Sequence, residues 1–107
     1  MSGPTRLDDL PDDVGEVLHS FAVMARFRRA ADSPQLAESA VRREMQAVRD
    51  LFDDVLVEPQ EPDGRWAVDV RFVVSSVDGE RAVNGVHATL REAGLQPDEA
   101  WVAERLP

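Results

Sequence analysis

Charged and apolar side chains alternate in two segments of the chain in a way that could build a binding surface. Met24, Arg26 and Arg28 are spaced by two residues, and so are Asp69 and Arg71. Residues two apart point to the same side of a β-strand, so each set would share one face. Arginines can hold an anion in bidentate fashion, while apolar side chains form the walls of a pocket. The first candidate site, for a ligand or a partner, therefore comprises Met24, Arg26, Arg28, Asp69, Arg71 and Trp101.

A second candidate is a run of acidic residues between positions 50 and 64, where no cation occurs. Asp50 and Asp54 would repel each other one helical turn apart, and acids at a helix C-terminus oppose the helix dipole. The spacing lacks the alternating ligands and central glycine of an EF-hand calcium loop. The run therefore favours a solvated acidic edge, or a patch that contacts a basic partner. This acidic patch comprises Asp50, Asp53, Asp54, Glu58, Glu61 and Asp63.

Other reactive residue types are sparse. Glu16 and His19 have the Glu-x-x-His spacing of di-iron carboxylate bundles, but such a site needs two of these pairs and two more glutamates on four helices. His87 lies among apolar residues and is expected at a core boundary. The chain has no cysteine, tyrosine or lysine, no G-x-S-x-G serine and no phosphate-binding glycine pattern. We therefore expect no catalytic residue, no metal site and no cofactor.

Length and charge narrow the class of protein. The 107 residues, 43% of them hydrophobic, suffice for one domain with one core. A net charge of -9 argues against a nucleic-acid partner and against binding to an anionic membrane surface. No segment has the apolar run of a signal peptide or a membrane span, so a cytoplasmic protein is expected. Every cation is an arginine, which indicates a GC-rich bacterial genome.

The hydrophobic pattern predicts the elements that must position these residues. Apolar residues alternate in the manner of half-buried strands, most clearly in two long runs. Three- and four-residue spacing predicts a helix from Pro34 to about Asp53, with Ser33 as its N-cap. A Pro62-Asp63-Gly64 turn indicates a hairpin. The predicted strands are 20–28, 55–58, 66–74 and 99–106.

The segment from Asp78 to Ala93 carries two competing signals. Asn84-Gly85 is typical of a two-residue hairpin turn. The apolar residues around it nevertheless keep helical spacing, and Asp78 is a suitable N-cap. We predict a helix that ends at Gly94 in a Schellman motif, with Gly85 allowing a close approach to the sheet.

The order strand, helix, strand, strand, helix, strand predicts an α+β fold. Specifically, it predicts a ferredoxin-like split βαβ sandwich (βαββαβ), in which two helices cover one face of a four-stranded antiparallel sheet. Crossover handedness would place the first and third strands in the middle. We expect residues 20–107 to form this single domain. Residues 1–19, with five acids against Arg6, form an acidic N-terminal segment that is either a short helix or a tail.

The sheet face without helices should carry the first candidate site, and it is too apolar for a fully solvated surface. We expect a second copy of the chain or the N-terminal segment to cover it. The leading hypothesis is a small cytoplasmic, non-catalytic interaction or regulatory module that forms a homo-oligomer, in the simplest case a dimer, through this face. One alternative is a small-molecule-binding protein or enzyme of the dimeric α+β barrel type, with a pocket on the same face. Another is an acidic inhibitor that docks on a basic partner protein through the acidic patch.

Overall fold

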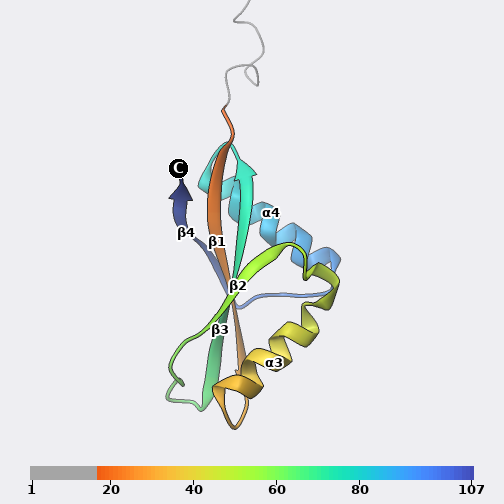
Figure 1. Cartoon of the computed structure of the whole chain (residues 1–107), viewed down its shortest axis with the longest axis vertical. Coiled ribbons are helices and arrows are strands. Elements are labelled where there is room, and N and C mark those ends of the chain that lie inside the picture. The colour runs from red at the N-terminus through yellow and green to blue at the C-terminus, as the bar shows by residue number, and fades with distance from the viewer. Residues whose placement is uncertain (1–16) are drawn as a thin grey trace, which may run out of the picture.

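The computed structural model of the chain describes residues 17–107 (Figure 1). The predicted N-terminal helix or tail falls almost entirely on residues outside this range. A short 3-10 helix spans Gln46–Val48. The elements are β1 (His19–Ala30), α3 (Pro34–Glu44), β2 (Phe52–Val57), β3 (Arg65–Ser76), α4 (Gly79–Glu92) and β4 (Glu99–Leu106).

The four strands form one antiparallel sheet in the order β2-β3-β1-β4. The two central strands pair over their whole length, from His19 opposite Ser76 to Ala30 opposite Arg65. The outer strands β2 and β4 are shorter, so each covers only part of its central neighbour. The predicted α+β class, with one four-stranded antiparallel sheet and two helices, is confirmed.

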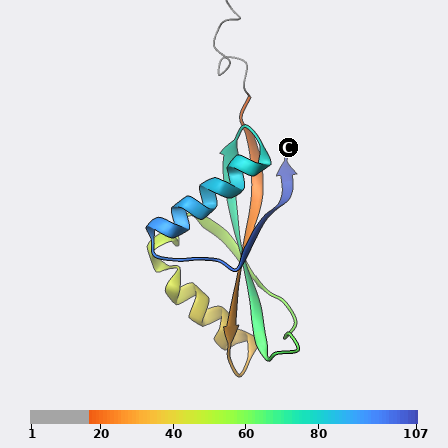
Figure 2. The same ribbon diagram turned by 180° about the vertical axis from the view of Figure 1, so that it is seen from behind.

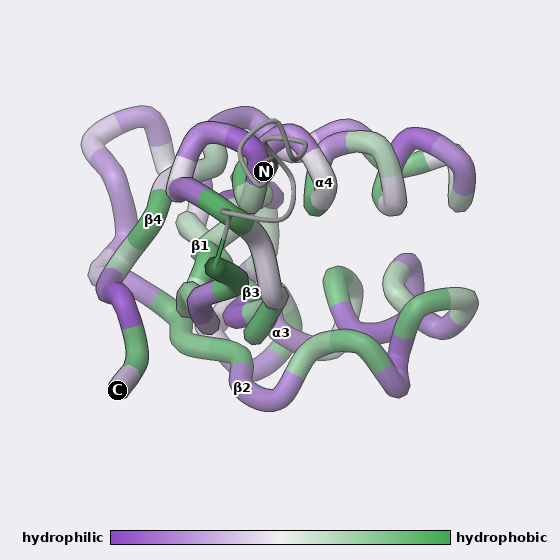
Figure 3. Tube along the Cα trace, turned by 90° about the horizontal axis from the view of Figure 1, so that it is seen from above, coloured by the Kyte–Doolittle hydropathy of each residue, from purple (hydrophilic) through white to green (hydrophobic). Residues whose placement is uncertain are grey.

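Both helices lie on the same side of the sheet, as the views from behind and from above show (Figure 2 and Figure 3). The reason is the alternation along the central strands, because every second residue of β1 and β3 is apolar and meets the apolar stripe of a helix. The resulting core is continuous and completely shielded from solvent at its centre. Its largest fully buried side chains are Phe27, Met45, Leu90, Val23, Val41, Val68 and Val70.

The predicted helix ends are confirmed where side chains define them. Ser33 Oγ accepts a hydrogen bond from the Leu36 N–H at 3.2 Å. Asp78 does the same for the Arg81 N–H at 2.8 Å. Gly94, at a φ of 79°, ends α4, and the Leu95 N–H donates to the Leu90 carbonyl in a Schellman motif.

The first helix is shorter than predicted, and the prediction that it runs to Asp53 is wrong. It ends at Glu44, and β2 already begins at Phe52. The helical spacing continues past Glu44, but Phe52 packs edge-on against Phe72 of β3, with ring centroids 6.1 Å apart. Pairing with the sheet therefore overrides the local periodicity.

The helical prediction for α4 is confirmed, but the role assigned to Gly85 is wrong. A Cβ at Gly85 would meet nothing within 4 Å, so this glycine faces open space. The close approach is at Gly79, where a Cβ would lie 3.1 Å from Cγ2 of Val102 in β4. The first turn of α4 therefore packs tightly on the sheet edge.

Candidate functional site

The helix-free side of the sheet, here called the open face, carries the first candidate site. Met24 stands opposite Arg71 on β3 and opposite Trp101 on β4. Arg26 stands opposite Asp69 in the same way, and Arg28 follows two residues later. Residues opposite each other in an antiparallel sheet point to the same side. The structure therefore brings all six candidate residues to this one face.

Arg26 and Asp69 form a bidentate ion pair at the centre of the open face. The guanidinium Nε lies 2.7 Å from Oδ1 of Asp69, and Nη2 lies 2.8 Å from Oδ2. Asp69 is only 2% exposed, and the Arg26 guanidinium also lies 5.0 Å from the centroid of the Trp101 ring. The hydrogen bonds from Arg26 to Asp69 raise the pKa of Arg26, against the opposing effect of desolvation. This arginine is therefore held by its carboxylate rather than available to a ligand.

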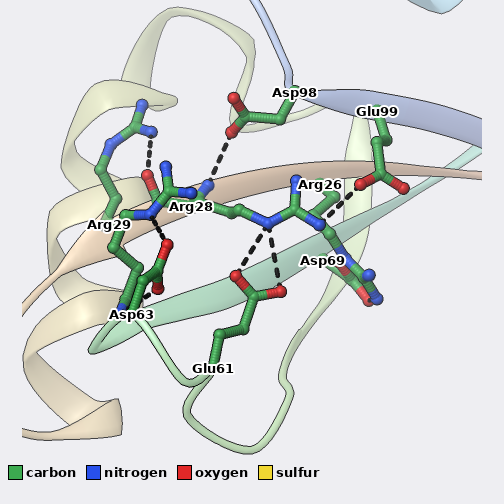
Figure 4. Close-up of polar contacts among 9 residues, drawn as sticks. Arg26, Arg28, Arg29, Glu61, Asp63, Asp69, Asp98 and Glu99 are labelled. Atoms are coloured by element: carbon green, nitrogen blue, oxygen red, sulfur yellow. Dashed lines mark hydrogen bonds and ion pairs between the residues drawn. The ribbon is translucent and has the colours of Figure 1, made fainter.

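Arg28 joins three acidic residues at the end of β1 (Figure 4). Its Nη2 lies 2.6 Å from Glu99, and its Nε lies 2.9 Å from Oε1 of Glu61. The backbone N–H of the same residue donates to the Asp98 carboxylate at 2.8 Å. The hydrogen bonds to Glu99 and then Glu61 raise the pKa of Arg28. The network ties the β2–β3 hairpin and the start of β4 to the central strand.

The third arginine of the open face is also paired. Arg71 Nη1 lies 2.6 Å from Oδ2 of Asp53, at the point where a register shift between Phe52 and Asp54 displaces β2. Every arginine of the first candidate site thus already bonds a carboxylate of the same chain. An anionic ligand would have to displace one of these acids.

The centre of the open face is buried although no helix covers it. Ala22 and Ala67 are each 1% exposed, and Met24 is 6% exposed. Long side chains on neighbouring strands, such as Arg26 and Trp101, are able to lie over these small residues. Two large apolar side chains of this face remain exposed, Leu56 at 47% and Val73 at 43%.

The acidic patch is distributed along β2 and the following hairpin instead of converging on one point. Asp53 pairs with Arg71, Glu61 with Arg28, and Asp63 with Arg65. Hydrogen bonds from the Arg65 backbone and side chain lower the pKa of Asp63. Asp54 accepts a hydrogen bond from the N–H of Val55, whereas Asp50 and Glu58 have no ion pair within residues 17–107. Half of the patch is therefore neutralised by arginines of the same molecule.

Three acids of these networks were not among the candidate residues. Asp98 binds the Arg28 backbone, Glu99 pairs with the Arg28 side chain, and Glu44 pairs with Arg29. Glu61 was named as part of the acidic patch, but its partner Arg28 was not anticipated. The residues that meet are separated by 15 to 71 positions, so no local pattern signals them. Glu44 ends α3, and Glu61 and Asp98 lie in connections between elements, so only the folded chain brings these residues together.

The two histidines occupy separate places. His19 begins β1, and its Nδ1 accepts a hydrogen bond from the Arg105 guanidinium at 2.8 Å; its proposed companion Glu16 lies outside the described residues. His87 is half-buried on α4 and lines a hollow of about 170 Å³ with Arg91, Leu95, Gln96 and Pro97. Within residues 17–107 neither histidine is hydrogen-bonded to a serine, a threonine or a carboxylate, as a catalytic histidine would be.

Within residues 17–107 no group of three or more histidine or acidic side chains is arranged to hold a metal ion. Over the same residues, no helix is both long and apolar enough to cross a membrane. No protein-family model, curated protein or solved structure matches the chain.

Proposed function

We propose that this protein is a small, non-catalytic interaction module that self-associates through the open face of its sheet. The observation that carries the proposal is a sheet face that no helix covers, on which the arginines are paired internally while Leu56 and Val73 stay exposed. The strand order and the placement of both helices support the ferredoxin-like split βαβ sandwich as the fold.

The internal ion pairs make the open face suitable for burial against a protein. Burying a lone charge costs several kcal/mol, whereas a charge that already has its partner loses less on desolvation. Arg26 with Asp69 and Arg28 with Glu61 and Glu99 are such neutralised groups. The same pairing works against the alternative of an anion-binding pocket, because no open-face arginine is left without a carboxylate.

The size of the open face sets the expected strength. The strands β1, β2, β3 and β4 have 12, 6, 12 and 8 residues, and at about 3.3 Å per residue and about 4.8 Å between strands they span about 600 Å². Stable dimers bury about 600–1,000 Å² per partner. The area of the open face lies at the lower limit of this range, so we expect a dissociation constant in the micromolar range.

Sedimentation velocity over a concentration series tests the proposal. We expect a monomer–dimer equilibrium that Leu56→Glu weakens by about tenfold or more, since it places a charge in the interface. Leu36→Glu is the matched control, because Leu36 is 55% exposed on α3, on the opposite side of the sheet. Added salt should strengthen the dimer, because it screens the repulsion between two acidic copies. A monomer at high micromolar concentration, or equal effects of the two variants, would overturn the proposal.

A further inference from the structure

The two central strands extend beyond their outer neighbours at opposite ends of the sheet. The two extensions differ in whether their outward backbone groups are hydrogen-bonded. β4 pairs with β1 only as far as Arg26, so residues Phe27 to Ala30 of β1 have no partner in β4. β2 pairs with β3 only as far as Phe72, so residues Val73 to Ser76 of β3 have no partner in β2. Each extension has a paired side, toward the other central strand, and a side with no strand (Figure 1).

The β1 extension is closed by side chains. The Arg28 N–H donates to the Asp98 carboxylate at 2.8 Å, and the Arg28 carbonyl accepts from the Arg29 guanidinium at 2.8 Å. The Arg26 carbonyl accepts from the Asp98 N–H. Both polar backbone groups that point outward at Arg28 are therefore satisfied, which is how proteins prevent an edge from pairing with another chain.

The β3 extension has no such closure. The Glu58 N–H donates to the Ala67 carbonyl, so the backbone groups of Ala67 point toward β2. Because these groups alternate in direction along a strand, the N–H and carbonyl of every second residue of β3 after Ala67 point the same way. β3 pairs with β1 without a register shift, so the alternation continues to Val73 and Ser75. β2 has no residue opposite Ser75, so within the described residues the outward N–H and carbonyl groups of Ser75 have no strand partner.

A small apolar groove lies along this free edge. It has a volume of about 120 Å³ and is lined by Leu51, Phe72, Val73, Val74, Val86 and Thr89. Leu51 is 53% exposed and Val73 is 43% exposed. An apolar side chain on the α4-facing side of an added strand would fill this groove, because alternate residues of a strand point to opposite sides.

The neighbouring charge specifies the other side of the added strand. Asp50, Asp53 and Asp54 lie at the start of β2, next to Leu51 of the groove, in a hollow that Arg42 and Arg49 also line. Asp53 pairs with Arg71, whereas Asp50 and Asp54 have no ion pair within residues 17–107. Over those residues sixteen acids face eleven arginines. Basic side chains on the added strand would therefore be attracted to this edge.

We propose that the Val73–Ser76 edge of β3 binds an extended segment of another protein, in which apolar and basic residues alternate, by β-strand addition. A second copy of β3 fits less well. Its Val73–Ser76 segment carries no basic side chain, and, paired antiparallel about Val74, its Ser76 would fall opposite Phe72, a position that Phe52 already occupies. This binding surface goes beyond the proposed self-association and does not depend on it.

The premise is tested by amide hydrogen exchange on the full chain at low concentration. The Ser75 N–H should exchange about a hundredfold or more faster than that of Val74, which is directed toward β1, because only a strand-paired amide is protected. Slow exchange of Ser75 at every concentration would mean that the chain covers its own edge. Protection that grows with protein concentration would assign the edge to a second copy. Either result overturns the proposal.

Binding is tested with two blocked heptapeptides, one alternating valine with arginine and the other valine with glutamate, in an NMR titration. The basic peptide should perturb the amides of Leu51 and of Val73–Ser76 and bind about tenfold more tightly than the acidic one, and added salt should weaken it. Ser75→Pro removes only an outward N–H and should weaken binding about tenfold. Ser75→Ala retains this N–H and should bind as tightly as the parent protein. Perturbations elsewhere, none at this edge, or unchanged binding by a folded Ser75→Pro protein would overturn the proposal.

Discussion

Replacement of Arg26 by methionine should destabilise the fold far more than the same change at Arg71, another arginine of the open face. Both arginines lie in central strands and bond an aspartate, but the side chain of Asp69 is 3% exposed and that of Asp53 is 50% exposed. Arg26→Met leaves a buried carboxylate without its cation, which costs about 3–5 kcal/mol. Arg71→Met leaves a solvated one, which costs about 1 kcal/mol or less.

Urea denaturation followed by far-UV circular dichroism measures the difference without relying on Trp101, which Arg26 contacts. For a chain of this size, with a slope of about 1.5 kcal/mol per molar urea, a loss of 3 kcal/mol lowers the midpoint by about 2 M. The methionine keeps most of the apolar stem, so the loss reports on the charge and not on packing.

A second substitution separates the buried charge from other causes. Asp69→Asn in the Arg26→Met background removes the negative charge. It should recover most of the lost stability, because no buried carboxylate is then left without its cation. Equal losses for Arg26→Met and Arg71→Met, or no recovery in the double variant, would refute the view that Asp69 requires its arginine.

Three further changes test the local interpretation. Gly85→Ala should stabilise α4 by about 0.5–1 kcal/mol, because the glycine is exposed and a Cβ meets nothing there. Asp78→Ala should cost about 1 kcal/mol by removing the N-cap of the same helix, while Asp78→Asn should retain most of the capping stabilisation. Glu44→Gln should cost up to about 1 kcal/mol at neutral pH, because the hydrogen bond from Arg29 lowers the pKa of Glu44 below its ordinary value of 4.5. A group with a lowered pKa stabilises the fold above its unfolded pKa and loses this effect as the pH falls through its folded pKa, so the cost should fade below about pH 4.5. All three are measured as free energies of unfolding.

Each of these changes has an outcome that contradicts its reason. A destabilising Gly85→Ala would mean that the helix meets another surface at this position. Equal losses for alanine and asparagine at Asp78 would remove the capping argument. A constant difference between Glu44→Gln and the parent protein from acidic to neutral pH would show that the Arg29 pair contributes no electrostatic stabilisation.

Alternation along the strands and the residues at helix ends were readable from the sequence because their causes are local. A two-residue period defines which side of β1 faces the core, and Ser33 and Asp78 bond to N–H groups only three residues away. The same alternation placed Met24 and Arg26 on the open face together with Asp69 and Arg71. In each case the deciding contact lies within a few residues or follows from the pleat of the strand.

Contacts that depend on strand register were not readable. The sequence assigned Glu61 to a solvated patch, but the hairpin returns it to Arg28, 33 residues away. The helical spacing that continues toward Asp53 is overruled because Phe52 finds a partner on β3. Gly85 illustrates the same limit. The side of α4 that faces the sheet was inferred correctly from Val86 and Leu90. The position at which the helix comes closest to the sheet depends instead on β4, which the helical spacing does not reveal.

The excess of acids therefore acts mainly at a distance. On the open face the carboxylates of Asp69, Glu61 and Asp53 are each bonded to an arginine, so a partner would meet neutral pairs at close range. The net charge of -9 is nevertheless still felt beyond the contact distance, up to about one Debye length of 8–10 Å. Charge of this kind governs how fast a basic partner arrives and how strongly a second copy is repelled, whereas buried contacts govern how long either stays. Salt should consequently change the association rate of a strand bound at Val73–Ser76 and leave its dissociation rate nearly constant, because backbone hydrogen bonds and the apolar groove would hold it in place.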